Sequence, residues 1–175
     1  MKATKIRENI YWVGAIDWNV RNFHGYLTQR GTTYNAYLII DEKITLIDTV
    51  KPGMEDEMLE RISDIIDPAK IDYIISNHVE MDHSGGLPRI MELAKNATII
   101  TCPNGDKGLK KHYKQDWDFK IVKTGDSLSL GKMTLDFILT PMVHWPDNMY
   151  SYLREEKILF SNDSFGQHLA STARF

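Results

Sequence analysis

The 175-residue sequence has one cysteine, no long apolar run and little net charge. The single cysteine, Cys102, excludes an internal disulfide framework and a cysteine-rich structural zinc site, and it fits a reducing cytoplasm. No apolar run approaches the roughly 20 residues of a membrane span, and the first residues carry no signal-peptide pattern. A net charge of -3 provides no basic surplus for nucleic acid or a membrane surface. We therefore expect a cytoplasmic protein that binds neither.

Strand and helix patterns alternate along the chain, and 42% hydrophobic residues suffice for the core of one domain. Hairpin patterns lie at both ends, with strand–helix units between them. This order predicts an α/β fold of mixed α+β character, with helices packed on a mixed sheet rather than on a purely parallel one. The expected strands are residues 9–13, 35–40, 44–47, 73–76, 98–101, 119–122, 150–153 and 157–160, with two more around Gly131-Lys132. The expected helices are residues 54–66, 86–94 and 107–113.

The most informative segment is His-Val-Glu-Met-Asp-His at residues 78–83, directly after an apolar strand. In extended backbone, His78, Glu80 and Asp82 would leave the chain on the same side. Imidazoles and carboxylates at this density are costly to gather without a cation. His144 and Asp163 also lie at or just after the ends of apolar segments, where α/β proteins place functional loops. The pattern predicts a two-metal site.

The ligand types limit the choice of metal. Carboxylates mixed with neutral imidazoles suit iron, manganese or zinc. One carboxylate, best placed as Asp163, could bridge two ions about 3.5–4 Å apart. Asp48 ends a strand near the same edge, where it could orient a ligand histidine or stabilise a loop.

The motif His78-x-Glu80-x-Asp82-His83, followed by His144 and Asp163, resembles the metal motif of the metallo-β-lactamase superfamily. In the hydrolases of that superfamily the second position is normally a histidine. Glu80 at this position resembles the flavodiiron proteins instead. Further similar stretches cover nearly the whole chain, at residues 17–18, 23–26, 31–38, 46–50 and 162–168.

The resemblance implies an αββα sandwich that holds two iron ions and reduces dioxygen to water or nitric oxide to nitrous oxide. It implies that one iron is held by His78, Glu80 and His144. The second would be held by Asp82 and His83, with Asp163 bridging the two. His24 and Tyr26, far upstream in the chain, could reach over the metals as hydrogen-bond or proton donors or could be loop residues with local partners, and the resemblance slightly favours the first role. Trp145 would either form one wall of the metal pocket and keep it dry or simply pack against neighbouring side chains.

The chain departs from the family plan in length. Flavodiiron proteins use a seventh ligand, a histidine beyond the Asp163 motif, and a flavodoxin-like domain that binds FMN. We therefore expect residues 1–175 to form the N-terminal part of the metallo-β-lactamase-like di-iron domain, incomplete at its C-terminus and inactive without FMN. The expected partners are dioxygen or nitric oxide, rubredoxin or another electron carrier, and a second copy in a full-length homodimer.

Two other functions remain open from the sequence. A zinc-dependent hydrolase of the same superfamily would act through a metal-bound hydroxide. A ferritin-like carboxylate protein is suggested by Glu80-x-x-His83, which matches the spacing of helical di-iron bundles. That spacing occurs once, between a strand and Gly85-Gly86, and the four long helices of such a bundle are not predicted.

Overall fold

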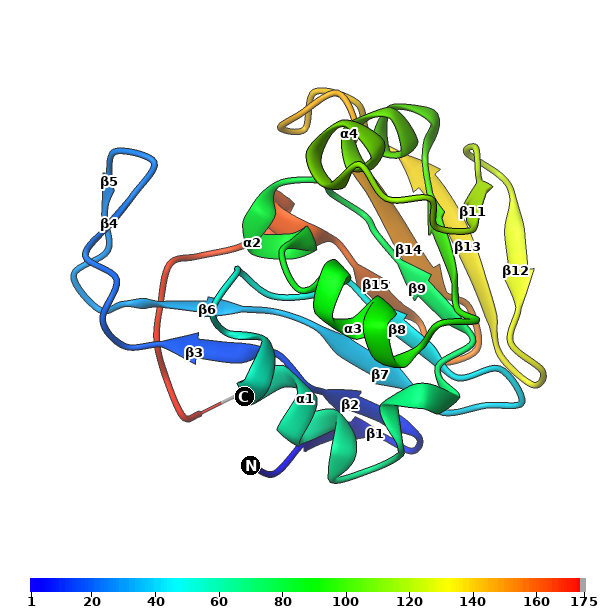
Figure 1. Cartoon of the computed structure of the whole chain (residues 1–175), viewed down its shortest axis with the longest axis horizontal. Helices are drawn as coiled ribbons and strands as arrows, with labels where there is room; N and C mark the ends of the chain where they lie inside the picture. The colour runs from blue at the N-terminus through cyan, green and yellow to red at the C-terminus, as the bar shows by residue number, and fades with distance from the viewer. Residues whose placement is uncertain (174–175) are drawn as a thin grey trace.

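The computed structural model describes residues 1–173, so the last two positions of the expected domain lie outside the description. Its elements form three layers: helices, a seven-stranded sheet and a four-stranded sheet (Figure 1). The two sheets exclude a four-helix bundle, and they confirm the expected mixed fold. Within the described residues, no helix has the length and apolar character to cross a membrane.

The larger sheet is mixed, as the sequence predicts. Its first four strands in spatial order are antiparallel and its last four are parallel, with one strand, β8, shared by both parts. In spatial order the strands are β1 (Thr4–Arg7), β2 (Ile10–Trp12), β7 (Tyr37–Ile39), β8 (Thr45–Ile47), β9 (Tyr73–Ile75), β10 (Thr98–Thr101) and β11 (Phe119–Ile121).

The smaller sheet is antiparallel and contains both C-terminal hairpins that the sequence predicts. Its strands are β12 (Ser127–Ser129), β13 (Thr134–Leu139), β14 (Met149–Leu153) and β15 (Ile158–Phe160). Two further pairs were not predicted, because strands of two or three residues are too short to show a period. They are β3 (Ala15–Asp17) with β6 (Thr32–Tyr34), and β4 (Asn22–Phe23) with β5 (Tyr26–Leu27).

The helices are α1 (Glu55–Ser63), α2 (Met81–Ser84), α3 (Leu87–Leu93) and α4 (Pro103–Tyr113), with 3₁₀ turns η1 (Pro68–Lys70) and η2 (Asn162–Phe165). Helix α4 begins four residues before the predicted start. The two glycines at 105 and 108 weaken the helical pattern there. Pro103 nevertheless suits a first helical position, and the Cys102 sulfur accepts a hydrogen bond from the Gly105 amide.

The central strands of the larger sheet are buried on both faces, which explains why apolar residues stand next to one another in them. Neighbouring residues of one strand enter different cores, because successive side chains point to opposite faces. Leu46 and Ile74 pack under α1, α3 and α4, whereas Ile47 and Ile75 pack against the smaller sheet. The core between the sheets also contains Phe137, which is fully buried.

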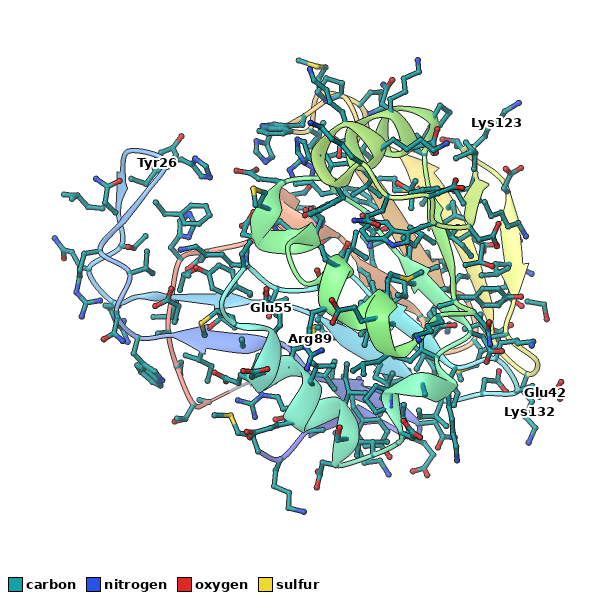
Figure 2. The ribbon with its side chains drawn as sticks, viewed as in Figure 1. Tyr26, Glu42, Glu55, Arg89, Lys123 and Lys132 are labelled. Carbon is teal, nitrogen blue, oxygen red and sulfur yellow. The ribbon has the colours of Figure 1, made fainter. Side chains whose placement is uncertain are left out.

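The turns of two hairpins tie the sheets together at an end of the molecule far from α2. Glu42 and Lys132 lie side by side there (Figure 2). The Lys43 amide donates to the Leu130 carbonyl over 2.8 Å, and the Met133 amide donates to the Asp41 carboxylate over 2.7 Å. These contacts fix the spacing of the sheets and so of the loops at their other end.

Candidate metal centre

Six carboxylate and imidazole side chains converge where loops of both sheets meet. His78 follows β9 of the larger sheet, and Glu80 to His83 lead into and form α2. His144 lies in the loop between β13 and β14, and Asp163 lies in η2 directly after β15. The sequence places these residues at element ends, and the structure brings all six together as two groups that share Asp163.

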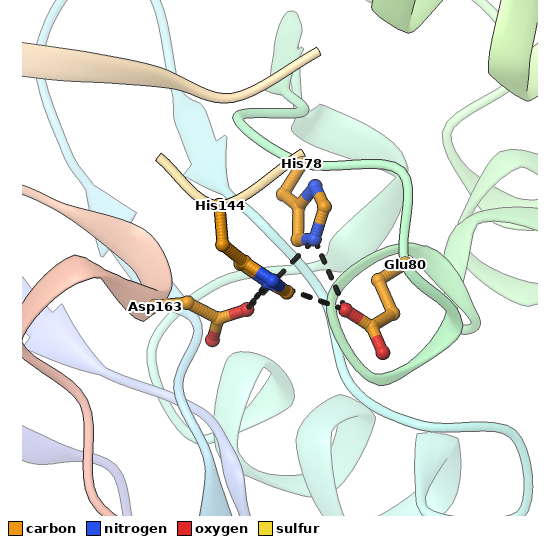
Figure 3. Close-up of side chains that lie close together, drawn as sticks. All are labelled: His78, Glu80, His144 and Asp163. Carbon is orange, nitrogen blue, oxygen red and sulfur yellow. Dashed lines mark hydrogen bonds and ion pairs between the residues drawn. The ribbon is translucent and has the colours of Figure 1, made fainter. Parts of the chain in front are cut away.

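The first group contains His78, Glu80, His144 and Asp163 (Figure 3). The Oε2 atom of Glu80 lies 3.2 Å from Nε2 of His78 and 3.5 Å from Nε2 of His144. The Oδ2 atom of Asp163 lies 3.0 Å from Nε2 of His144 and 3.8 Å from Nε2 of His78. Four donor atoms therefore surround one point.

The second group contains Asp82, His83 and Asp163. Nε2 of His83 lies 2.7 Å from Oδ1 of Asp163 and 3.3 Å from Oδ2 of Asp82. Asp163 thus directs one carboxylate oxygen to each group, which is the geometry of a bridging ligand.

The expected extended backbone through residues 78–82 is wrong. The chain turns into helix α2 at Met81, so Glu80 and Asp82 do not share a side of a strand. Glu80 instead joins His78 in the first group, and Asp82 joins His83 in the second. The alternation that the sequence suggests is replaced by a turn that divides the donor residues between two groups.

Buried donor atoms without hydrogen-bond partners indicate that these residues fit metal ions. In the described part of the chain, Oδ1 of Asp82 and Nε2 of His83 are buried and accept or donate no hydrogen bond. Nε2 of His83 lies close to the Asp163 carboxylate but makes no hydrogen bond with it, because the ring nitrogen is not aligned for one. Such atoms are costly to bury unless a cation binds them. Three neutral imidazoles and three carboxylates also offset most of the charge of two divalent ions.

The pKa values of three of these six residues are strongly shifted from their ordinary values. Burial lowers the pKa of His78, but hydrogen bonds to Asp147 and Glu80 outweigh it and raise the pKa to about 9. Burial likewise opposes the charged form of His83, yet the carboxylates of Asp163 and Asp82 hold its pKa well above the ordinary value. Burial raises the pKa of Asp163, and the neighbouring histidines outweigh it, so the pKa lies well below its usual range. A bound metal would displace the proton from the coordinating nitrogen of each histidine.

The three further residues expected near the metals occupy different positions. Nε2 of His24 lies 2.8 Å from Oε1 of Glu80, the oxygen that faces away from the first group. The Trp145 ring meets the His78 ring edge-on, with 5.2 Å between centroids. Tyr26 lies at the tip of the projecting β4–β5 hairpin and stacks on His168, so its role over the metals stays a prediction (Figure 2).

A cleft of about 720 Å³ is lined by five of the six donor residues, and His78, which is fully buried, lies behind them. Its walls include Phe23, Tyr34 and Trp145, and His24 and Tyr26 lie on the side of the β4–β5 hairpin. The cleft is large enough for a diatomic molecule and for a larger group above it.

Asp48 stabilises a loop rather than contacting a ligand histidine directly. Its carboxylate accepts hydrogen bonds from the backbone and side-chain nitrogens of Asn77 over 2.8 and 3.0 Å, and from Asn162 over 3.2 Å. Burial raises the pKa of Asp48 despite these donors. Asn77 also accepts a hydrogen bond from Ser151, so it links the two sheets just before His78.

Replacing Asn77 by alanine should destabilise the domain by about 1–3 kcal/mol. The buried Asp48 carboxylate and the Ser151 hydroxyl would both lose a partner. Urea denaturation measures the change in the free energy of unfolding. Asn19→Ala on the exposed loop is the matched control and should change stability by less than about 0.5 kcal/mol. Equal stabilities of the two variants would contradict this account.

Two residues beside the ligands were not assigned a role from the sequence. Asp147 hydrogen-bonds to His78, and Asn162 lies next to His83. Pro146-Asp147-Asn148 follows the pattern of an exposed turn, which hides the burial of its carboxylate. The one feature of the sequence that could have pointed to Asp147 is its position three residues after His144, a predicted metal ligand.

The three-layer fold defines a metallo-β-lactamase-like domain, and its two donor groups, which share a carboxylate, could each hold a metal ion. Residues 32–174 match the family described as ODP family beta lactamase. The chain therefore belongs to the ODP beta-lactamase family and is a domain of the flavodiiron type.

Several proteins that are similar to this chain have names that describe reductases or oxidoreductases. The chain is 51% identical over 173 residues to a nitric oxide reductase of Moorella thermoacetica, covering 97% of this chain and 43% of the relative. It is 51% identical over 177 residues to a rubredoxin-oxygen oxidoreductase of Megalodesulfovibrio gigas, covering 100% and 44%. The crystal structure of the flavodiiron protein from Giardia intestinalis superimposes with a TM-score of 0.97 at 41% identity, covering 100% of this chain and 43% of that chain. This chain thus spans less than half the length of these relatives.

Proposed function

We propose that this chain is the di-iron part of an oxidoreductase that reduces dioxygen to water, nitric oxide to nitrous oxide, or both. The observation that carries the proposal is the pair of donor groups that share Asp163, with Glu80 among the ligands. A carboxylate stabilises the ferric state better than an imidazole does, which suits a centre that alternates between diferrous and diferric forms. The names of the relatives support the same reaction class.

In this proposal His78, Glu80 and His144 hold one iron, Asp82 and His83 hold the other, and Asp163 bridges them. Iron ions held by these residues would supply electrons to a diatomic substrate and offset the negative charge that develops on it. Electrons would come through FMN on a flavodoxin-like domain outside this chain, fed by rubredoxin or another electron carrier. The full-length protein would act as a cytoplasmic homodimer.

In this proposal, three further residues of the cleft donate hydrogen bonds or limit water access. His24 contacts the outer oxygen of Glu80, so its ring N–H can donate a hydrogen bond to that carboxylate while His24 itself binds no metal. Trp145 covers His78 and limits water access from that side. Tyr26 places a phenol at the rim of the cleft, where it can donate a hydrogen bond to substrate.

Metal analysis of anaerobically purified protein tests the proposal. We expect iron to be retained, and we expect the first group to fill before the second because it offers four donors against three. Mass spectrometry of iron and zinc per chain, combined with Mössbauer spectra during Fe(II) titration, measures both. Zinc without iron after growth with both metals would contradict the reductase and favour a hydrolase.

A further inference from the structure

Asp147 is a buried carboxylate directly behind the first group of donors. It is 4% exposed. Its Oδ2 atom accepts hydrogen bonds from Nδ1 of His78 over 2.9 Å and from the Val79 amide over 2.8 Å. Nε2, the other ring nitrogen of His78, faces Glu80 and Asp163. The imidazole is therefore held between a carboxylate on one side and the donor group on the other.

This contact determines which nitrogen of His78 carries the proton. An ionised carboxylate only accepts hydrogen bonds, so Nδ1 must be the protonated nitrogen of the neutral ring. Nε2 then presents its lone pair to the point that Glu80 and Asp163 surround. A carboxylate on the far nitrogen also makes the imidazole a stronger electron donor to a metal.

The other two histidines have different surroundings. Nδ1 of His83 lies 3.3 Å from the amide nitrogen of Asn162, and this amide is in turn bound to Asp48. The His144 side chain is 52% exposed, whereas that of His78 is fully buried. Within the described residues, therefore, His78 is the ligand histidine whose Nδ1 hydrogen-bonds to a carboxylate.

The start of α4 fixes the position of Asp147. The Cys102 thiol donates to the Asp147 carbonyl over 3.0 Å, and the Asn104 side chain donates to the Pro146 carbonyl over 3.0 Å. Cys102 is buried and also caps α4, so the 144–148 loop is attached to a rigid element. Asp147 is thus anchored independently of the metal ligands.

We propose that Asp147 is the positioning residue that holds His78 as an Nε2 ligand and makes the first donor group the tighter of the two metal sites. The inference rests on the proposed metal centre and adds a residue and an order of affinity to it. It predicts that the negative charge of Asp147 and its position as a hydrogen-bond acceptor contribute separately to the metal affinity of the first donor group.

Co(II) titration of the 175-residue chain, followed by its visible absorption, separates these contributions. Asp147→Ala should weaken the tighter site about 100-fold because His78 loses its orienting partner. Asp147→Asn should weaken it about 10-fold, since the amide oxygen can still accept both hydrogen bonds but carries no charge. Asn104→Ala is the matched control: it removes one of the two hydrogen bonds between the start of α4 and this loop, but it leaves the Cys102–Asp147 hydrogen bond and His78 in place, so we expect wild-type affinity.

Proton NMR of the Co(II)-loaded protein gives a readout that a merely structural role would not change. A ligand histidine with a buried Nδ1–H gives a paramagnetically shifted signal that exchanges slowly with solvent. This signal should be present in the wild type, in Asp147→Asn and in Asn104→Ala. It should be lost in Asp147→Ala.

Wild-type affinity and an intact shifted signal in Asp147→Ala would overturn the inference while leaving the metal centre standing. An equal loss of affinity in Asn104→Ala would also overturn it, because loop anchoring would then explain the effect. A wild-type chain that binds neither Co(II) nor Fe(II) would contradict the metal centre itself. Thermal melting checks that each variant folds, and Asp147→Asn decides the matter if Asp147→Ala does not fold.

Discussion

Asp163→Ala should abolish stable iron binding at both sites, whereas removal of a ligand to one group should affect mainly that group. Asp163 directs Oδ2 to the first group and Oδ1 to the second, so its loss removes a donor from each. It would also leave the second group with Asp82 and His83 alone. Metal affinity depends on the number of correctly placed anionic ligands. Iron per chain after anaerobic desalting, measured by mass spectrometry, should fall to near zero.

Asp136→Ala is the matched control for this experiment. Asp136 pairs with Arg154 on the smaller sheet and belongs to neither donor group. It should retain the iron content of the wild type. Asp163→Ala protein that keeps one tightly bound iron per chain would contradict the expectation that both sites need Asp163.

Phe137→Ala should destabilise the domain by about 3–5 kcal/mol. Phe137 is fully buried between the two sheets, and truncation leaves a cavity where the layers meet. Differential scanning calorimetry should show a melting temperature lower by roughly 6–20 °C for a chain of this size.

Ile138→Ala, on the next residue of the same strand, is the control. Its side chain points to the other face of β13 and is 39% exposed, so we expect a loss below about 1 kcal/mol. Similar losses for both variants would contradict the assignment of this face of β13 to the core. The comparison tests the packing that places Asp163 opposite His78.

Much of the architecture could be predicted because the relevant patterns are local. The apolar runs at 73–76 and 98–101 predict β9 and β10 within one residue, and the Gly131 turn predicts the β12–β13 hairpin. Burial of these strands on both faces follows from their adjacent isoleucines, Ile74-Ile75 and Ile99-Ile100, because neighbouring side chains point to opposite faces. The pairs β3–β6 and β4–β5 could not be predicted, because they depend on tertiary contacts rather than on a repeating pattern.

The candidate site was predictable in composition but not in geometry. The density of imidazole and carboxylate groups at 78–83 is visible in the sequence, as are His144 and Asp163. The division of the donors into two groups depends on the turn at Met81, which a pattern of alternating polar residues conceals. Asp147 was hidden for a different reason: burial of a carboxylate in a Pro-Asp-Asn turn arises from α4, a helix that begins some forty residues earlier.

The donors of the first group come from both sheets, and this has a consequence for folding. His78 and Asp163 are 85 positions apart in the sequence, so a cation held by both cross-links the ends of a long loop. Closing such a loop removes much of the freedom of the unfolded chain, as a disulfide does. Because the unfolded chain lacks the assembled ligands, the free energy of metal binding becomes free energy of folding. This chain has one cysteine, which is buried, so it cannot form an internal disulfide. The metal centre would provide the cross-link between distant parts of the chain instead.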